Sequence, residues 1–200
     1  MVSTMAKRFN NPTRKQRNLM CLVYCEGETE YWYLNKVLNS REVKLIPANN
    51  SDSNVLKMVN AACKEFNKPE RYKALYCVFD HDASSNTKEQ LQSANQIILQ
   101  NNHIRVFSNL SFEVVFCFAN KFTTSIYPSV KVIEAVISKE NNIEYKKQQI
   151  VVETLANKLS FNAICDNAKK CYEQLNINND NWLEIQDSYS EIFKLKDLAS

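Results

Sequence analysis

Acidic side chains follow two apolar segments that lie far apart along the chain. Glu26 comes directly after the apolar run of residues 19–25, and Asp80 and Asp82 follow a second apolar run that ends at Phe79. Like charges that crowd together raise each other's pKa unless a cation compensates for them. Carboxylate oxygens suit Mg²⁺ or Mn²⁺, which keep several waters and take further ligands from a phosphate substrate. If the carboxylates converge, they predict metal-assisted phosphoryl chemistry.

The order of the expected elements brings these acids together. Residues 19–25 and 74–79 show no helical periodicity, which is typical of strands buried on both faces of a parallel sheet. Shorter strands are expected at 42–46 and 103–107, with a helix between each strand and the next, so the fold class is α/β with a doubly wound, four-stranded parallel sheet. Such sheets often take the order 2-1-3-4, which makes the first and third strands neighbours. Glu26 and the two aspartates would then share one crevice at the carboxyl ends of these strands.

Gly27 is the only glycine in the chain. It stands where a strand must turn tightly into a helix, so we expect either a positive φ angle or a ligand beside it. Glu28 and Glu30 open that helix, where negative charge suits the helix dipole, and this structural interpretation is favoured over a metal-binding role for both.

The aspartates also have a structural interpretation. Asp82 could cap the helix that begins near Ser85, and for either aspartate alone a cap or a solvent-facing position is the favoured interpretation. The presence of Glu26-Gly27 at the end of the neighbouring strand reverses that preference.

The pattern changes after residue 110. Residues 111–118 fit a buried helix or another strand, and Ser111 as a cap favours the helix. Further helices are expected at about 129–139, 147–159, 160–175 and 181–198. We therefore divide the chain into a basic arm at 1–18, an α/β domain at 19–120 and a helical appendage at 121–200 that packs on the core.

The net charge of +3 is too small to identify a partner, but its distribution is uneven. The amino-terminal arm carries only cations before the first acid, Glu26. Such an arm often contacts the phosphates of nucleic acid, and it could equally be a solvated leader. The cations concerned are Lys7, Arg8, Arg14, Lys15 and Arg17.

The cysteine pattern predicts a reducing compartment. The chain has 7 cysteines, an odd number, and none of them forms a C-x-x-C pair. Several lie within apolar runs, as expected for reduced thiols that act as small core residues, and we do not expect them to bind a metal. No apolar run approaches the length of a membrane span, and the amino terminus lacks a signal-peptide core. We expect a cytoplasmic protein that does not enter a membrane.

The acidic motifs resemble those of a known domain. The segment Val23-Tyr24-Cys25-Glu26-Gly27-Glu28-Thr29-Glu30, with Phe79-Asp80-His81-Asp82 downstream, resembles the Toprim domain of topoisomerases, primases and OLD-type nucleases. The segment Ser108-Asn109-Leu110-Ser111-Phe112-Glu113 resembles the S-N-P-x-F-E signature of the RloB/AbiLii family of bacterial defence-associated proteins. The resemblance covers about residues 17–120.

The resemblance implies a nuclease. It implies that Glu26 acts as general acid or base and that Asp80 and Asp82 bind Mg²⁺ (or Mn²⁺) during cleavage of DNA or RNA. It also implies a role in anti-phage defence beside an ATPase partner of the OLD/AAA type. Leu110 replaces the family's proline, Val114-Val115-Phe116 replaces an aromatic-rich E-x-W-L, and His81 stands where an arginine is common, so substrate choice cannot be carried over.

Further residues near the expected crevice are open to two interpretations. Glu113 could be another metal ligand or base, or it could simply cap a helix or neutralise Arg105. Ser108 and Asn109 could contact a phosphate or only form the turn. His81 could transfer a proton, although an exposed loop position is the favoured interpretation.

The sequence is also compatible with two other functions. A receiver-like switch domain also places acids after its first and third strands and a hydroxyl residue, here Ser108, after its fourth. It normally needs two acids after the first strand and a lysine after the fifth, and neither is clear here. The third alternative is a non-catalytic module whose helical part binds an ATPase subunit.

Overall fold

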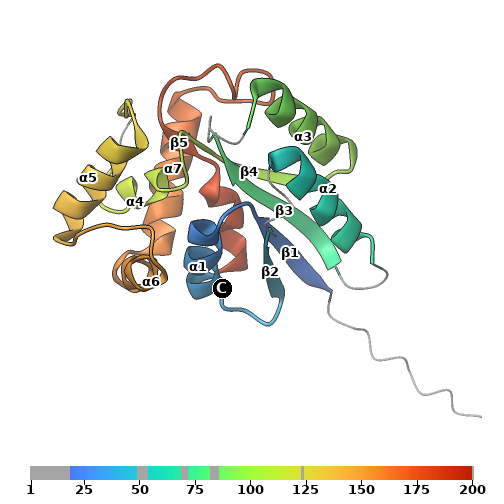
Figure 1. Ribbon diagram of the computed structural model, residues 1–200, viewed down its shortest axis with the longest axis horizontal. Helices are drawn as coiled ribbons and strands as arrows, with labels where there is room; N and C mark the ends of the chain where they lie inside the picture. The colour runs from blue at the N-terminus through green and yellow to red at the C-terminus, as the bar shows by residue number, and fades with distance from the viewer. Residues whose placement is uncertain (1–18, 49–53, 69–71, 82–85, 123, 200) are drawn as a thin grey trace, which may run out of the picture.

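The computed structural model describes residues 19–48, 54–68, 72–81, 86–122 and 124–199. The described part forms one mixed sheet with helices on both faces (Figure 1). Its strands are β1 (Met20–Cys25), β2 (Val43–Pro47), β3 (Tyr72–Asp80), β4 (Ile104–Asn109) and β5 (Tyr189–Ser190). The helices are α1 (Glu28–Val37), α2 (Val55–Phe66), α3 (Lys88–Gln100), α4 (Val114–Cys117), α5 (Val130–Asn141), α6 (Gln149–Lys158), α7 (Phe161–Gln174) and the 3-10 helix η1 (Ile192–Leu198).

The strand order is β2-β1-β3-β4-β5. The first four strands are parallel, and their order is the expected 2-1-3-4, with β1 between β2 and β3. This arrangement follows from the long apolar runs of β1 and β3, which are buried because helices cover both faces of the sheet. Helices α2 and α3 cover one face, whereas α1, α7 and η1 lie on the other (Figure 1).

The chain after residue 120 contributes to the sheet as well as to the helical layer. Strand β5 pairs antiparallel with β4, Ser190 beside Ser108 and Tyr189 beside Asn109, so the sheet has five strands rather than the expected four. The expected helix at 181–198 is wrong: this stretch contains β5 and η1. Tertiary contacts override the helical spacing there, because Trp182 packs edge-on against Phe107 with ring centroids 4.5 Å apart.

Helix boundaries follow local capping signals. Thr87 and Gln90 form a capping box at the start of α3, and the Asn54 side chain accepts a hydrogen bond from the Lys57 N–H at the start of α2. The ambiguous segment after residue 110 is a tight turn followed by the four-residue helix α4, whose residues are all buried.

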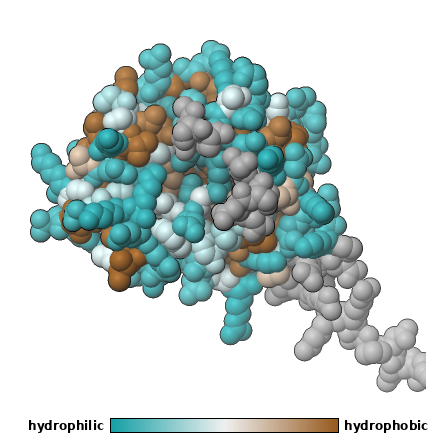
Figure 2. All heavy atoms as spheres, in the orientation of Figure 1, coloured by the Kyte–Doolittle hydropathy of each residue, from teal (hydrophilic) through white to brown (hydrophobic). Residues whose placement is uncertain are grey.

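The core is continuous across the sheet and the later helices. Tyr33 of α1 is fully buried and meets Phe112 and Phe116 edge-on, with ring centroids 5.9 and 5.1 Å apart. The visible surface is mostly hydrophilic with scattered apolar side chains (Figure 2). Among the described helices, none is long and apolar enough to cross a membrane.

Candidate functional site

Glu26 and Asp80 lie side by side at the carboxyl ends of β1 and β3. The Glu26 N–H donates to the Val78 carbonyl at 2.9 Å, which extends the pairing of the two strands to their ends. The Asp80 N–H then points at Glu26 Oε2 at 3.4 Å. The parallel register therefore brings together two acids that are far apart in sequence. Asp82, the third acid of the motif, and the cations of the basic arm lie outside the described residues.

The Glu26 carboxylate is held in place from a second direction. Asn86 donates from Nδ2 to Glu26 Oε1 at 2.8 Å, and Asn86 Oδ1 accepts from the Val55 N–H at 2.7 Å. Because both ends of the Asn86 amide are engaged, its orientation is fixed and it fixes Glu26 in turn. Asn86 is buried, and the sequence interpretation had not placed it in the site.

Gly27 has a steric role that differs from the expected one. Its φ is −120°, and no glycine in the described chain has a positive φ, so the first of the two expected alternatives, a positive φ, is wrong. A Cβ atom at this position would lie only 2.6 Å from Glu30 Oε2. The glycine is needed because the Glu30 carboxylate folds back over the first turn of α1.

Glu30 belongs to the site even though its sequence position favoured a structural role. It is buried at 5% exposure, and its pKa is raised well above the usual range by burial and then by the charge of Asp80. The charges of Glu113 and Glu26 act in the same direction. The sequence signal for this residue was present in Gly27, whose missing side chain leaves the space that Glu30 occupies.

Glu113 is the fourth acid of the group. It is 1% exposed, and its Oε1 accepts from Tyr145 Oη at 3.3 Å and pairs with Lys147 Nζ at 3.0 Å. Glu113 Oε2 has no hydrogen-bond partner among the described residues. The expected alternative, that Glu113 neutralises Arg105, does not describe the geometry, because Arg105 pairs with Glu191.

The acids influence one another strongly. We call Glu26, Glu30, Asp80 and Glu113 the strand-end cluster. The pKa of Asp80 is raised to about 8, first by burial and next by the charge of Glu26, although Asp80 keeps part of its surface exposed. The Phe112 N–H donates to Asp80 Oδ2 at 3.0 Å and acts in the opposite direction. Excess negative charge in a poorly hydrated site is the condition that a divalent cation relieves.

A hollow of about 300 Å³ opens beside the strand-end cluster. Its lining combines Asp80 and His81 with residues from the turn before α4, the start of α5 and the connector between α5 and α6. Lys147 reaches it from this connector. Burial alone would lower the pKa of Lys147, but the neighbouring carboxylates, Glu113 first, outweigh burial and raise it. The amine is therefore held in its charged form.

Asn109 orients the side chain of His81, which lines the hollow. Asn109 Nδ2 donates to the carbonyls of Ile185 and Asp187, both at 2.9 Å, so its Oδ1 faces His81 Nδ1 at 3.2 Å. An amide oxygen only accepts, so His81 Nδ1 carries the donated proton. Ser108 is buried and its hydroxyl pairs with that of Ser190 at 2.8 Å.

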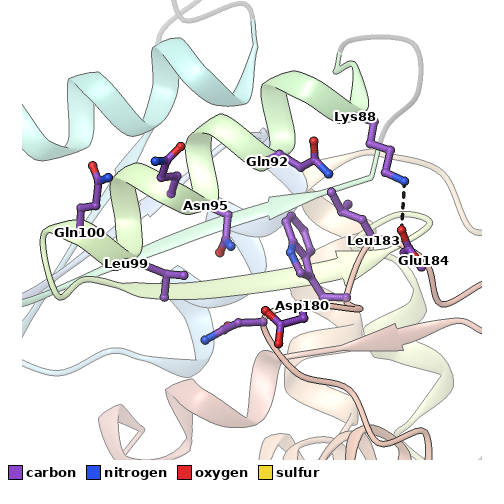
Figure 3. A pocket seen from close by; sticks show the side chains of 11 residues that line it. Lys88, Gln92, Asn95, Leu99, Gln100, Asp180, Leu183 and Glu184 are labelled. Atoms are coloured by element: carbon purple, nitrogen blue, oxygen red, sulfur yellow. Dashed lines mark hydrogen bonds and ion pairs between the residues drawn. The ribbon is translucent and has the colours of Figure 1, made fainter.

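A second hollow, of about 250 Å³, lies between α3 and residues 179–184 (Figure 3). Amide side chains of α3 line it, and Lys88 pairs with Glu184 across it at 3.4 Å. It contains no member of the strand-end cluster. Asp80, an acid singled out from the sequence, lines the first hollow instead.

The donor set of the strand-end cluster fits a hard cation. It offers carboxylate oxygens, which Mg²⁺ and Mn²⁺ prefer, and one of these oxygens, Glu113 Oε2, lacks a partner among the described residues. Within the described ranges, no group of three or more Cys, His, Asp or Glu side chains is already close enough to enclose an ion. The case for a divalent cation at the strand-end cluster therefore depends on two features: its donors are carboxyl oxygens, and like charges raise the pKa values of Glu30 and Asp80.

Comparison with protein families identifies the chain. The model of the family described as RloB-like protein matches residues 21–197. The chain belongs to the RloB-like family. Searches of curated proteins and of solved structures found no match.

The family match extends beyond the segment that carried the resemblance. Residues 17–120 resembled RloB/AbiLii proteins, and the RloB-like match includes α5, α6 and α7 as well. Tyr145 and Lys147 of this RloB-like chain therefore lie inside the matched range. Sequence reasoning missed both, because they lie in a connector with no local motif.

Proposed function

We propose that this RloB-like chain is a metal-dependent nuclease of the Toprim type that cleaves phosphodiester bonds of DNA or RNA with Mg²⁺ or Mn²⁺. The observation that carries the proposal is the convergence of Glu26 and Asp80, with Glu30 and Glu113 close enough to raise the pKa of their neighbours. A role in bacterial anti-phage defence beside an OLD/AAA-type ATPase is part of the same proposal.

Each acid has a distinct place in the proposed reaction. Glu26, oriented by Asn86, would accept or donate a proton at the reacting oxygen. Asp80 would hold the metal ion together with Asp82, and Glu30 and Glu113 would supply further carboxyl groups near Asp80. When bound, the divalent ion would polarise the phosphoryl oxygen and neutralise developing charge.

A purely structural role explains the strand-end cluster less well. Buried charges that only support a fold are paired and hydrogen-bonded, because leaving them uncompensated is costly. Here one described cation, Lys147, faces several carboxyls, and a buried oxygen of Glu113 lacks a partner in the described chain. The raised pKa values of Glu30 and Asp80 add to this argument, because perturbed pKa values cluster at functional sites.

The test is cleavage of labelled DNA and RNA by the whole chain with Mg²⁺ or Mn²⁺. Glu26→Gln and Asp80→Asn should each lower the rate by about a hundredfold or more, since each removes a charged group from the reacting centre. Glu28→Gln is the matched control: it makes the same change two residues from Glu26, on an exposed side chain, and should leave the rate unchanged. Folded Glu26→Gln and Asp80→Asn variants that cleave as fast as the parent would overturn the proposal.

A further inference from the structure

The hollow beside Asp80 is closed on one side by the start of α5. Ser129 and Val130 line it, and α5 runs for 12 residues from Val130. The first N–H groups of a helix have no partner inside the helix, and they carry the positive end of its dipole. A helix start of this kind attracts anions, phosphate above all.

The start of α5 lacks the groups that usually satisfy it. The Ser129 side chain makes no capping hydrogen bond, and the first turn contains no acid. The second helical residue, Lys131, is a cation, which is the unfavourable sign of charge at this end. By contrast, α3 begins with a complete capping box and has Glu89 in its first turn.

A second, independent observation concerns Ser111, which lines the same hollow. Ser111 is 3% exposed, it lines the hollow, and its Oγ has no hydrogen-bond partner among the described residues. A buried hydroxyl without a partner costs free energy, so its retention points to a group that binds there. Tyr33 Oη and Glu113 Oε2 are also buried without a hydrogen-bond partner among the described residues, but neither residue lines this hollow.

Charge decides what kind of anion can enter. Lys147, the dipole of α5 and Lys131 attract negative charge, whereas Glu113, and Asp80 once it is ionised, repel it. An anion is therefore favoured when it arrives with a divalent cation that the carboxylates attract. A phosphate group meets this condition because its oxygens bind Mg²⁺ on one side and N–H donors on the other.

We propose that the first turn of α5, Ser111 and Lys147 form the phosphate-binding subsite of this protein, next to the carboxylates at the ends of β1 and β3. The identity of the ligand as a nucleic-acid phosphate rests on the proposed function, but the anion site itself does not. The subsite also gives the chain after residue 120 a direct part in substrate binding, since α5 and Lys147 both come from it.

The direct test is titration of the whole ¹⁵N-labelled chain with inorganic phosphate in the presence of Mg²⁺. The amide signals of Val130 and Lys131 should shift on binding. Ser129→Asp keeps a good N-cap residue but places a carboxylate where the phosphate would lie, so it should weaken phosphate binding by at least about tenfold. Ser160→Asp, the same change at the exposed N-cap of α7, is the matched control and should bind like the parent.

Ser111→Ala separates a ligand-binding role from a structural one. Loss of an unpartnered buried hydroxyl should leave the melting temperature equal or higher, whereas phosphate affinity should fall severalfold. A melting temperature that falls while affinity stays at the parental value would show a structural role and overturn the assignment of Ser111.

The outcome for the subsite can be distinguished from the outcome for the nuclease. Phosphate binding that Ser129→Asp weakens, in a protein that cleaves neither DNA nor RNA, would support the subsite and overturn the proposed function. Cleavage by the parent and by Ser129→Asp at equal rates, with no phosphate-dependent shift at Val130 or Lys131, would support the nuclease and overturn the subsite.

Discussion

Two buried groups of charged residues differ in how their charges are paired: one is centred on Arg105 of β4, and the other is the strand-end cluster. In the first, Arg105 donates two hydrogen bonds to the Glu191 carboxylate, of 3.0 and 2.8 Å, and Lys194 pairs with the same carboxylate at 2.8 Å. Asn95 accepts from Arg105 at 2.8 Å, and the Arg105 guanidinium lies over the Trp182 ring at 4.1 Å. In the strand-end cluster, Lys147 pairs with Glu113 at 3.0 Å.

The pKa values of the acids shift in opposite directions in the Arg105 group and in the strand-end cluster. Burial acts to raise the pKa of Glu191, but Arg105 and Lys194 outweigh burial and lower it. In the strand-end cluster, burial and like charges act together, and the pKa values of Glu30 and Asp80 rise. In the Arg105 group each charge has an oppositely charged partner, and the pairs tie residues 191–194 to β4. The proposed role of the strand-end cluster is to hold a cation and an anionic substrate.

The largest expected effect comes from breaking the Arg105 group. Arg105→Met should lower the free energy of unfolding by about 3–5 kcal/mol, because it leaves Glu191 and Asn95 buried without their main partner. Lys88→Met is the matched control: it breaks the exposed pair with Glu184 and should cost no more than about 1 kcal/mol. Urea unfolding measures both, and equal losses would contradict the distinction between the two kinds of pair.

Removing an acid from the strand-end cluster should raise the free energy of unfolding, whereas Arg105→Met lowers it. In metal-free protein, the Asp80 carboxyl has a pKa of about 8 when folded and an ordinary pKa of about 3.9 when unfolded. Between these values the folded state holds the extra proton, so this group makes stability fall as pH rises, by at most ~1.4 kcal/mol per pH unit. Below about pH 4 and above about pH 8 it adds no further slope.

Asp80→Asn tests this sign. The variant should be more stable than the parent at pH 8 in the absence of metal, and the difference should shrink as the pH falls toward 4. Urea unfolding at several pH values measures it. Parent and variant curves that stay parallel across this range would show that Asp80 carries no such shift.

A divalent cation should reverse the imbalance of the strand-end cluster and leave the Arg105 group unaffected. We expect 10 mM Mg²⁺ to raise the melting temperature of the parent, because an ion that binds only the folded protein stabilises it. The gain is about 2.7 kcal/mol when the ligand is present at a hundred times its dissociation constant. Asp80→Asn should lose this response. Lys88→Met should keep it, and a response of equal size in Asp80→Asn would place the cation elsewhere.

The sequence allowed much of this arrangement to be predicted, for physical reasons. The apolar runs of β1 and β3 and the alternation of strands with helices were enough to predict the parallel order, and parallel order brings Glu26 and Asp80 together. Local patterns could not find Lys147, because the connector that carries it is placed by the packing of α5 against α4 and of α6 against α1. Strand β5 is two residues long, too short to leave a periodic signal.

Glu30 shows a second reason why the sequence alone did not identify every residue of the site. An acid in the first turn of a helix suits the dipole whether it faces water or a buried site, so its position alone favoured the surface interpretation. The informative residue was Gly27, whose neighbour in space is the Glu30 carboxylate. A single glycine in a chain of 200 residues marked a close approach by a side chain of the protein itself.

The smallest expected effect concerns this contact. Gly27→Ala places a Cβ 2.6 Å from Glu30 Oε2, so the Glu30 carboxylate must move away from the other acids. Because the clash involves the far end of a flexible side chain, we expect a loss of about 1 kcal/mol in stability and a larger proportional loss of cleavage rate. In an E30A background, the same substitution should cost almost nothing, since the clashing atoms are gone. A double-mutant cycle measured by urea unfolding gives the coupling, and additive effects of the two substitutions would show that Gly27 serves a partner other than Glu30.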